Sequence, residues 1–105
     1  MLYDVRFLDD ALADLDEIIL HIAQDSKAAA LKVHDMIIEK AEKLSKFPKL
    51  GREVPDKKLA ELGFRMLISG SYLIFYKIDD DVIHIHRVIH GARNYPMLFG
   101  ETHET

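Results

Sequence analysis

The sequence lacks cysteine altogether, lacks long apolar runs and has fewer basic than acidic side chains. The absence of cysteine excludes a disulfide framework, a thiol nucleophile and a zinc site with cysteine ligands. No apolar stretch approaches the roughly 20 residues that a membrane-spanning helix needs. A signal peptide has an apolar run near the N-terminus, and Asp4 stands where that run would be. We therefore expect a cytoplasmic protein with no membrane segment.

The charge balance bears on the class of partner. Lysine and arginine together number 14, against 18 aspartate and glutamate residues, and the formal net charge is −4. Proteins that bind nucleic acid usually do so through a basic surface. This composition therefore favours a protein partner over nucleic acid. A chain of 105 residues is long enough for one core, and we expect a single domain over residues 1–105.

Hydrophobic spacing in the first half predicts a strand and two helices. Residues Tyr3–Phe7 alternate apolar and charged side chains, as a half-buried strand does. Apolar residues at helical spacing then predict helices over Leu8–Gln24 and Lys27–Lys46. Asp9 and Asp10 stand where an N-cap and a first-turn acid stabilise the start of the first helix.

Short breaks define where the two helices end. Asp25 and Ser26 separate them and supply a fresh N-cap. Because almost no linker remains between the helices, we expect an antiparallel hairpin. Pro48 ends the second helix, since proline disfavours helical geometry at the residue before it.

The second half predicts a loop followed by three strands. Glycine, proline and mixed charge over Lys49–Gly63 indicate a loop, with a possible short turn at Lys57–Leu62. The expected strands are Phe64–Ser69, Tyr72–Ile78 and Val82–Ile89. The tail from Gly91 is expected to be irregular. The predicted fold class is α+β: an N-terminal strand, a two-helix antiparallel hairpin on one face of the sheet, and a further three-stranded antiparallel segment.

Turn lengths decide which side chains share a face of the sheet. Gly70-Ser71 forms a two-residue turn, and the run Asp79–Asp81 holds the second turn. With two residues in each turn, one face carries Arg65, Leu67, Ser69, Tyr72, Ile74, Tyr76, Ile83, Ile85, Arg87 and Ile89. The other face carries Phe64, Met66, Ile68, Leu73, Phe75, Lys77, His84, His86 and Val88. A three-residue second turn would exchange the faces of the last strand.

Both faces are rich in apolar side chains, and the helical hairpin can cover only one. The other is either covered by the tail at Met97, Leu98 and Phe99 or left exposed. A large exposed apolar patch usually marks an interaction site. This pattern indicates that the protein binds another polypeptide.

Several segments resemble the RelE/ParE toxins of bacterial toxin–antitoxin pairs. Leu12–Ile18 is similar to the first-helix pattern of ParE-type toxins, and Phe47–Arg52 resembles their proline followed by Leu-Gly-Arg. Tyr72–Tyr76 and the ending Ile85–Arg93 resemble the C-terminal half of these toxins. The resemblance covers nearly the whole chain and implies one of two activities.

One branch resembles RelE and cleaves messenger RNA in the ribosome. The resemblance implies lysines and arginines on the sheet that stabilise phosphorane charge, and a Tyr or His near the C-terminus that moves a proton. Four of these positions hold apolar residues here: Phe64, Met66, Leu73 and Phe99. Arg93 alone matches, which disfavours this chemistry. An endoribonuclease with an altered site would have to use Arg93, His90 and Arg65 or Arg87.

The other branch resembles ParE, which binds and inhibits DNA gyrase, and the resemblance favours this branch. It implies target contacts near the C-terminus, at Arg93, Asn94, Tyr95, Met97 and Phe99. The partners implied are gyrase, or the ribosome with mRNA in the alternative, and in either case a cognate antitoxin in a hetero-oligomer. The antitoxin is expected to fold onto apolar surface, with contacts at Phe64, Met66, Leu73 and Phe75.

Other polar residues allow two interpretations each. The histidines at 84, 86 and 90 have a spacing that could bind a metal, yet no carboxylate or cysteine nearby completes the site, so no metal and no cofactor is expected. His90 is either a general acid or base or a structural histidine. Arg65 and Arg87 allow a functional interpretation, a nucleic-acid platform with tyrosines. The structural interpretation is that they pack over tyrosine rings or pair with helix acids such as Asp14 or Glu17, and the acidic net charge favours it.

Overall fold

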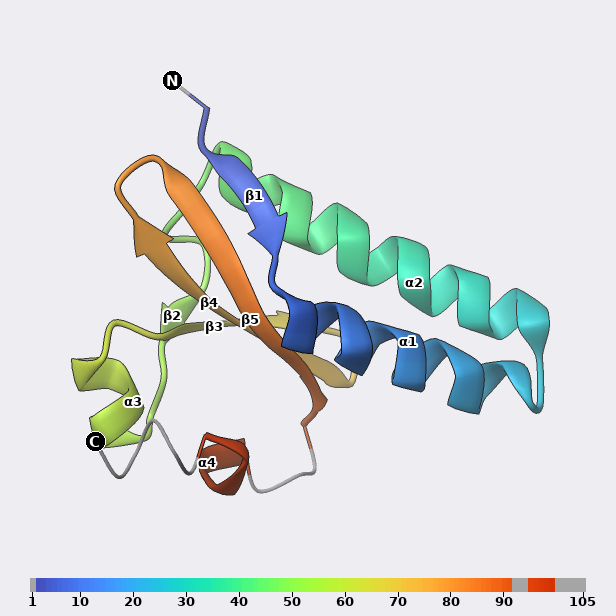
Figure 1. Ribbon diagram of the computed structural model, residues 1–105. Helices are drawn as coiled ribbons and strands as arrows, with labels where there is room; N and C mark the ends of the chain where they lie inside the picture. Colours follow the sequence, from blue (N-terminus) through green and yellow to red (C-terminus); the bar gives the residue numbers. More distant parts are fainter. Residues whose placement is uncertain (1, 92–94, 100–105) are drawn as a thin grey trace.

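A computed structural model describes residues 2–91 and 95–99 of the chain (Figure 1). The elements in chain order are β1 (Asp4–Phe7), α1 (Asp9–Ala23), α2 (Lys27–Glu42), the 3₁₀ helix η1 (Lys43–Ser45), β2 (Arg52–Glu53), α3 (Lys57–Glu61), β3 (Arg65–Ser69), β4 (Tyr72–Asp79), β5 (Val82–His90) and α4 (Tyr95–Leu98). None of the described helices is both long enough and apolar enough to cross a bilayer.

The strands form one sheet in the order β1-β5-β4-β3-β2. β1 runs parallel to β5, and all other neighbours are antiparallel. The predicted α+β class and the order of its main elements are confirmed. The sheet gains a fifth strand because Arg52 and Glu53, inside the expected loop, pair with Met66 and Arg65. The tail also differs from expectation, since residues Tyr95–Leu98 form a short helix.

The helical hairpin follows from local signals at its ends. Ser26 is the N-cap of α2, and its Oγ accepts a hydrogen bond from the backbone N–H of Ala29 at 3.1 Å, as predicted. The prediction of Asp9 as the N-cap of α1 is wrong, because Leu8 holds that position without a side-chain bond. Asp9 and Asp10 lie in the first turn, where acids favour the helix dipole.

The two helices cover one face of the sheet. Figure 1 shows α1 and α2 packed side by side on this face, away from α3 and α4. The core between helices and sheet includes side chains with no solvent exposure, among them Ala11, Ile37, Ala41, Leu44, Ile74, Tyr76, Ile83 and Ile85. The alanines on the helices let both backbones approach the sheet closely.

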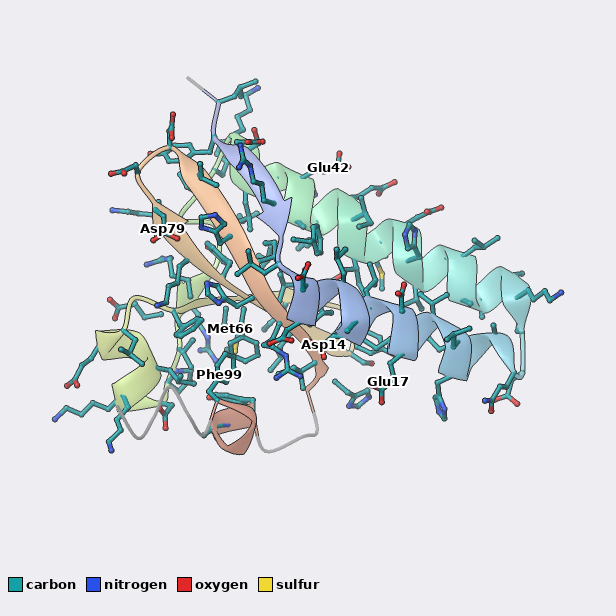
Figure 2. All side chains as sticks on the ribbon, in the orientation of Figure 1. Asp14, Glu17, Glu42, Met66, Asp79 and Phe99 are labelled. Carbon is teal, nitrogen blue, oxygen red and sulfur yellow. The ribbon has the colours of Figure 1, made fainter. Side chains whose placement is uncertain are left out.

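A second core lies on the opposite face, which we call the far face. Its buried members come from loops, short helices and strands: Val54, Leu59, Phe64, Met66, Phe75, Ile89 and Phe99. The segment containing α4 covers this face, as one of the two sequence-based alternatives had it. Figure 2 places Met66 and Phe99 together on the side of α3 and α4.

A register shift in β5 corrects the predicted faces. The second turn does have two residues, since Asp79 pairs with Val82. However, Phe75 pairs with Arg87 and Tyr76 with Ile85, so His86 is an extra residue between them. Such a bulge shifts the alternation of all later side chains. Val88 therefore lies in the helix-facing core and Ile89 in the far-face core, the reverse of the prediction.

Candidate functional site

The bulge in β5 is tied to α1 by one carboxylate. Asp14 accepts two hydrogen bonds from the Arg87 guanidinium, Nε at 2.7 Å and Nη2 at 2.8 Å. The same carboxylate accepts the backbone N–H of Val88 at 3.0 Å. The hydrogen bond with Asp14 raises the pKa of Arg87 above its ordinary value. The expected pairing of Arg87 with a helix acid is thus confirmed at Asp14, which Figure 2 labels on α1 beside β5.

Arg65 and Tyr76 hold the turn that follows η1. The expected pairing with a helix acid is wrong for Arg65, which instead donates to the carbonyl of Gly51, with Nη2 at 2.6 Å. The Tyr76 hydroxyl donates to the carbonyl of Pro48 at 2.8 Å and accepts the N–H of Gly51 at 3.0 Å. A Cβ at Gly51 would lie 2.7 Å from the Met66 carbonyl oxygen, so this position requires glycine. These contacts give the Pro-Lys-Leu-Gly-Arg segment a structural role, because they fix it to β3 and β4.

Lys77 is the third cation of β3, β4 and β5. Its ammonium lies 4.5 Å from the centre of the Phe64 ring, a distance at which a cation is attracted to the ring face. The three cations of β3, β4 and β5 therefore have partners within the chain: a carbonyl for Arg65, an aromatic ring for Lys77 and a carboxylate for Arg87.

The positions expected to bind an antitoxin lie mostly under other parts of the chain. Phe64, Met66 and Phe75 are 2%, 5% and 0% exposed, and Leu73 is partly buried beside them. The Phe99 ring packs against Phe64 and Phe75 at centroid distances of 5.0 and 5.4 Å. The structure thus brings these four predicted residues together as the floor of the far-face core.

The positions expected to bind the target are only partly described. Arg93 and Asn94 lie outside the described residues, and so does the side chain of Met97 in α4. Tyr95 packs against the Phe75 ring at 5.0 Å and remains partly exposed. Phe99 points inward and is 7% exposed.

The three histidines of β5 have separate environments. His84 Nδ1 lies 2.6 Å from a carboxylate oxygen of Asp79. The His86 ring packs edge-on against Phe64, and burial, followed by the charge of Lys77, lowers the pKa of His86. The His90 ring packs against Tyr72. Among residues 2–91 and 95–99, no group of three or more His, Asp or Glu side chains has an arrangement that could hold a metal ion.

The sequence does not indicate one polar pocket that the structure contains. Glu17, Ile18 and His21 of α1 line it with Tyr72 and His90, around a volume of about 350 Å³. Glu17 and His21 are four residues apart and share a helix face, but nothing in the sequence places that face beside the ends of β4 and β5. A carboxylate, two imidazoles and a phenol there could exchange protons with a ligand.

Comparison with known proteins gives consistent matches. The family model described as "ParE toxin of type II toxin-antitoxin system, parDE" matches residues 5–95. Toxin RelE2 of Caulobacter vibrioides is 35% identical over 83 residues, which span 79% of this chain and 89% of that protein.

Two solved structures have a similar fold. A structure of the chromosomal ParDE toxin–antitoxin system from P. aeruginosa superposes with a TM-score of 0.72 at 22% identity, over 85% of this chain and 96% of that one. The toxin–antitoxin complex RelBE2 from Mycobacterium tuberculosis gives 0.63 at 29% identity, over 86% and 99% of the two chains.

Proposed function

The chain belongs to the ParE toxin family of type II toxin–antitoxin systems, and from this premise we propose that it acts in the cytoplasm by binding and inhibiting DNA gyrase. The partner antitoxin neutralises it in a hetero-oligomer. The choice of target rests on one observation, which is that the cations of β3, β4 and β5 already have partners. Arg65, Lys77 and Arg87 all have partners within the chain, whereas in-line cleavage of RNA needs cations directed at the phosphate.

The apolar positions of the sheet support the same proposal. Phe64, Met66 and Leu73 stand where a RelE-like nuclease is expected to carry cations, and Phe99 where it carries a proton donor. These side chains form a packed core with little solvent access. Apolar groups in such a core neither bind phosphate nor exchange protons, so inhibition by binding fits the sheet better than catalysis does.

We place the gyrase contacts on the segment from Arg93 to Phe99. Tyr95 is partly exposed and can contact a partner directly. Phe99 is buried against Phe64 and Phe75, so its role in this proposal is to hold the segment on the sheet. Arg93, Asn94 and Met97 complete the proposed contact set.

Two assays on one preparation of purified protein test the target. Inhibition of gyrase supercoiling with intact mRNA in a programmed ribosome assay is the expected result. Arg93→Ala and Tyr95→Ala should weaken that inhibition, while Arg6→Ala on the remote strand β1 should leave it unchanged. Codon-positioned mRNA cleavage without any effect on gyrase would overturn the gyrase proposal and leave the family assignment intact.

A ribonuclease remains the second candidate, for two specific reasons. A curated relative is named Toxin RelE2, and the α1 pocket carries potential acid–base groups at Glu17, His21 and His90. If mRNA is cleaved, Glu17→Gln and His90→Ala should abolish cleavage, with Asp16→Asn on the same helix as the control. Cleavage that survives both substitutions would exclude this pocket as the catalytic site.

The antitoxin contacts at Phe64, Met66, Leu73 and Phe75 require a rearrangement. Because Phe99 packs on the rings of Phe64 and Phe75, an antitoxin segment can reach these two residues only by displacing the C-terminal segment. The chain has no tryptophan, so Phe99→Trp supplies a single fluorescent probe. Its emission should shift to the red when the antitoxin binds. An unchanged emission maximum on a saturated complex would show that the far face stays covered.

A further inference from the structure

The turn between η1 and β2 exposes two large apolar side chains. Phe47 is 57% exposed and Leu50 is 46% exposed. With Lys46, Pro48 and Lys49 they line an open hollow of about 470 Å³. We call residues 46–50 the turn surface. Other large apolar side chains of the described chain are also exposed, but here two of them line one hollow with polar residues beside them, which is the arrangement of an interaction site.

The turn surface is held in one shape by buried groups beneath it. The hydroxyl of the fully buried Tyr76 bonds to the backbone of Pro48 and of Gly51. Arg65 bonds to the Gly51 carbonyl from the side, and the N–H of Leu50 donates to the Phe47 carbonyl at 3.0 Å. A surface that is already ordered loses little conformational entropy on binding, which favours affinity.

The charge around the turn surface is opposite to that of the chain as a whole. Lys46 and Lys49 line the hollow, and exposed Lys43 and Arg52 flank it in sequence, followed on the outside by Glu42 and Glu53. Residues 42–53 therefore hold four basic and two acidic side chains. Within the described part of the chain, Lys46 and Lys49 form no ion pair. Helix α1, by contrast, carries five acidic residues and no lysine or arginine. An acidic partner is therefore repelled by α1 and attracted to the turn surface.

We propose that the turn surface docks an acidic segment of the antitoxin, which inserts an apolar side chain between Phe47 and Leu50. This inference rests on the proposed function for the identity of the partner. The lining of Phe47, Pro48 and Leu50 suits an apolar side chain, and the two lysines of the hollow suit neighbouring carboxylates. The segment reaches this surface without displacing any of the residues that the structure describes, unlike a segment that reaches the far face.

Binding of the antitoxin to the full chain, measured by titration calorimetry, tests the docking site. The probe is the purified product of the short reading frame that is expected to adjoin the gene of a toxin of this family. Phe47→Ala with Leu50→Ala should weaken binding about tenfold or more, because both side chains lie at the centre of the contact. Lys46→Glu with Lys49→Glu should also weaken binding and should reduce its dependence on salt.

Matched controls on α2 separate a local effect from a general one. Leu31 is 62% exposed, so Leu31→Ala removes a comparable apolar side chain, and Lys27→Glu with Lys32→Glu makes the same change in net charge. Both controls should bind as the unaltered protein does. All substituted side chains are exposed, and thermal melting confirms that each variant folds. Phe47→Trp adds a direct readout, with a blue shift of its emission expected on binding.

Each outcome decides between the proposals. Unchanged binding by both turn-surface variants, with tight binding by the unaltered protein, overturns the docking site and leaves the toxin function standing. No binding by the unaltered protein overturns the antitoxin partnership, and the docking site with it. Binding of a single-stranded RNA that both turn-surface variants lose, while the antitoxin binds them normally, assigns the surface to nucleic acid and overturns the inference.

Discussion

The two faces of the sheet are buried by different means. Helices α1 and α2, of 15 and 16 residues, cover one face and bring their own buried alanines, one leucine and one isoleucine. The far face is covered by the five-residue α3, the four-residue α4 and Phe99. A short segment that follows the last strand can leave the sheet without breaking it, whereas a helical hairpin cannot. The helix-facing core therefore contributes more to the stability of the fold than the cover of the far face does.

Polar contacts follow the same division. Asp14 connects α1 to Arg87 and Val88 of β5 through three hydrogen bonds. The described part of α4 contributes ring contacts to the far-face core through Tyr95, and its last turn is followed by Phe99. Ring packing depends on area and adapts to small shifts, while a bidentate carboxylate–guanidinium pair requires one geometry. This difference between the two faces can be tested by removing contacts on each face in turn.

The largest loss of stability is expected from the helix-facing core. Ile85 has no solvent exposure, so Ile85→Ala leaves a cavity that the surrounding helices and strands cannot fill. The free energy of unfolding in urea should fall by about 3–4 kcal/mol. The conservative change Ile85→Val should cost about 1 kcal/mol. Equal losses for the two variants would show that this core tolerates cavities.

A smaller loss is expected when the tie between α1 and β5 is cut. Asp14→Ala leaves the partly buried Arg87 guanidinium and the Val88 N–H without their carboxylate. The free energy of unfolding should fall by about 2–3 kcal/mol. Asp16→Ala on the exposed side of the same helix should change it by less than about 0.5 kcal/mol. A similar cost for both would mean that the tie has no structural role.

The far face should yield a smaller effect still. Phe99→Ala removes a ring from the second core, but the loss is limited to the free energy with which the C-terminal segment docks on the sheet. We expect a loss of about 1–2 kcal/mol in global stability. Hydrogen exchange of the β3 and β4 amides should accelerate at the same time. A loss as large as that of Ile85→Ala would contradict the division between the two faces.

The smallest expected effect on stability comes from the protonation of His86, at the rim of the far face. Burial and Lys77 hold the pKa of His86 below its usual value, although Asp79 and Asp10 act in the opposite direction. The unfolded chain therefore takes up the proton first as the pH falls, and stability should drop below about pH 6.5. Above that pH the group contributes no pH dependence.

Unfolding in urea between pH 5 and pH 8 checks this sign. The comparison is with His86→Gln, in which the drop should be smaller, and with His34→Gln, in which it should persist. A steeper drop in His86→Gln than in the unaltered protein would show that His86 gains its proton more easily when folded, contrary to the expectation.

Periodicity and caps located the main elements well, because these signals are local. Ser26 is the cap that it was expected to be, and the strands at Arg65–Ser69, Tyr72–Asp79 and Val82–His90 begin and end within about a residue of their predicted limits. Two other features were not predicted, because they depend on contacts between distant parts of the chain. The strand pair of Arg52 and Glu53 depends on the position of β3, and the bulge at His86 depends on both neighbouring strands.

The candidate site was less predictable than the fold. The pairing of Arg87 with a helix acid was expected, but its geometry required the bulge that frees the Val88 N–H. The pocket of Glu17, His21 and His90 joins positions about 70 residues apart in the chain, and no local pattern links them. The expected contacts at Arg93 and Asn94 lie outside the described residues and stay predictions.

The sequence by itself determined the class of fold, the helical hairpin, the hairpin turns and the toxin family, because spacing, capping and local motifs encode them. The tertiary structure alone decided which apolar residues are available to a partner. Phe75 and Phe47 are both phenylalanines, yet Phe75 is fully buried and Phe47 is 57% exposed. The reason is that burial depends on what packs above a side chain, and those covering groups come from distant parts of the sequence.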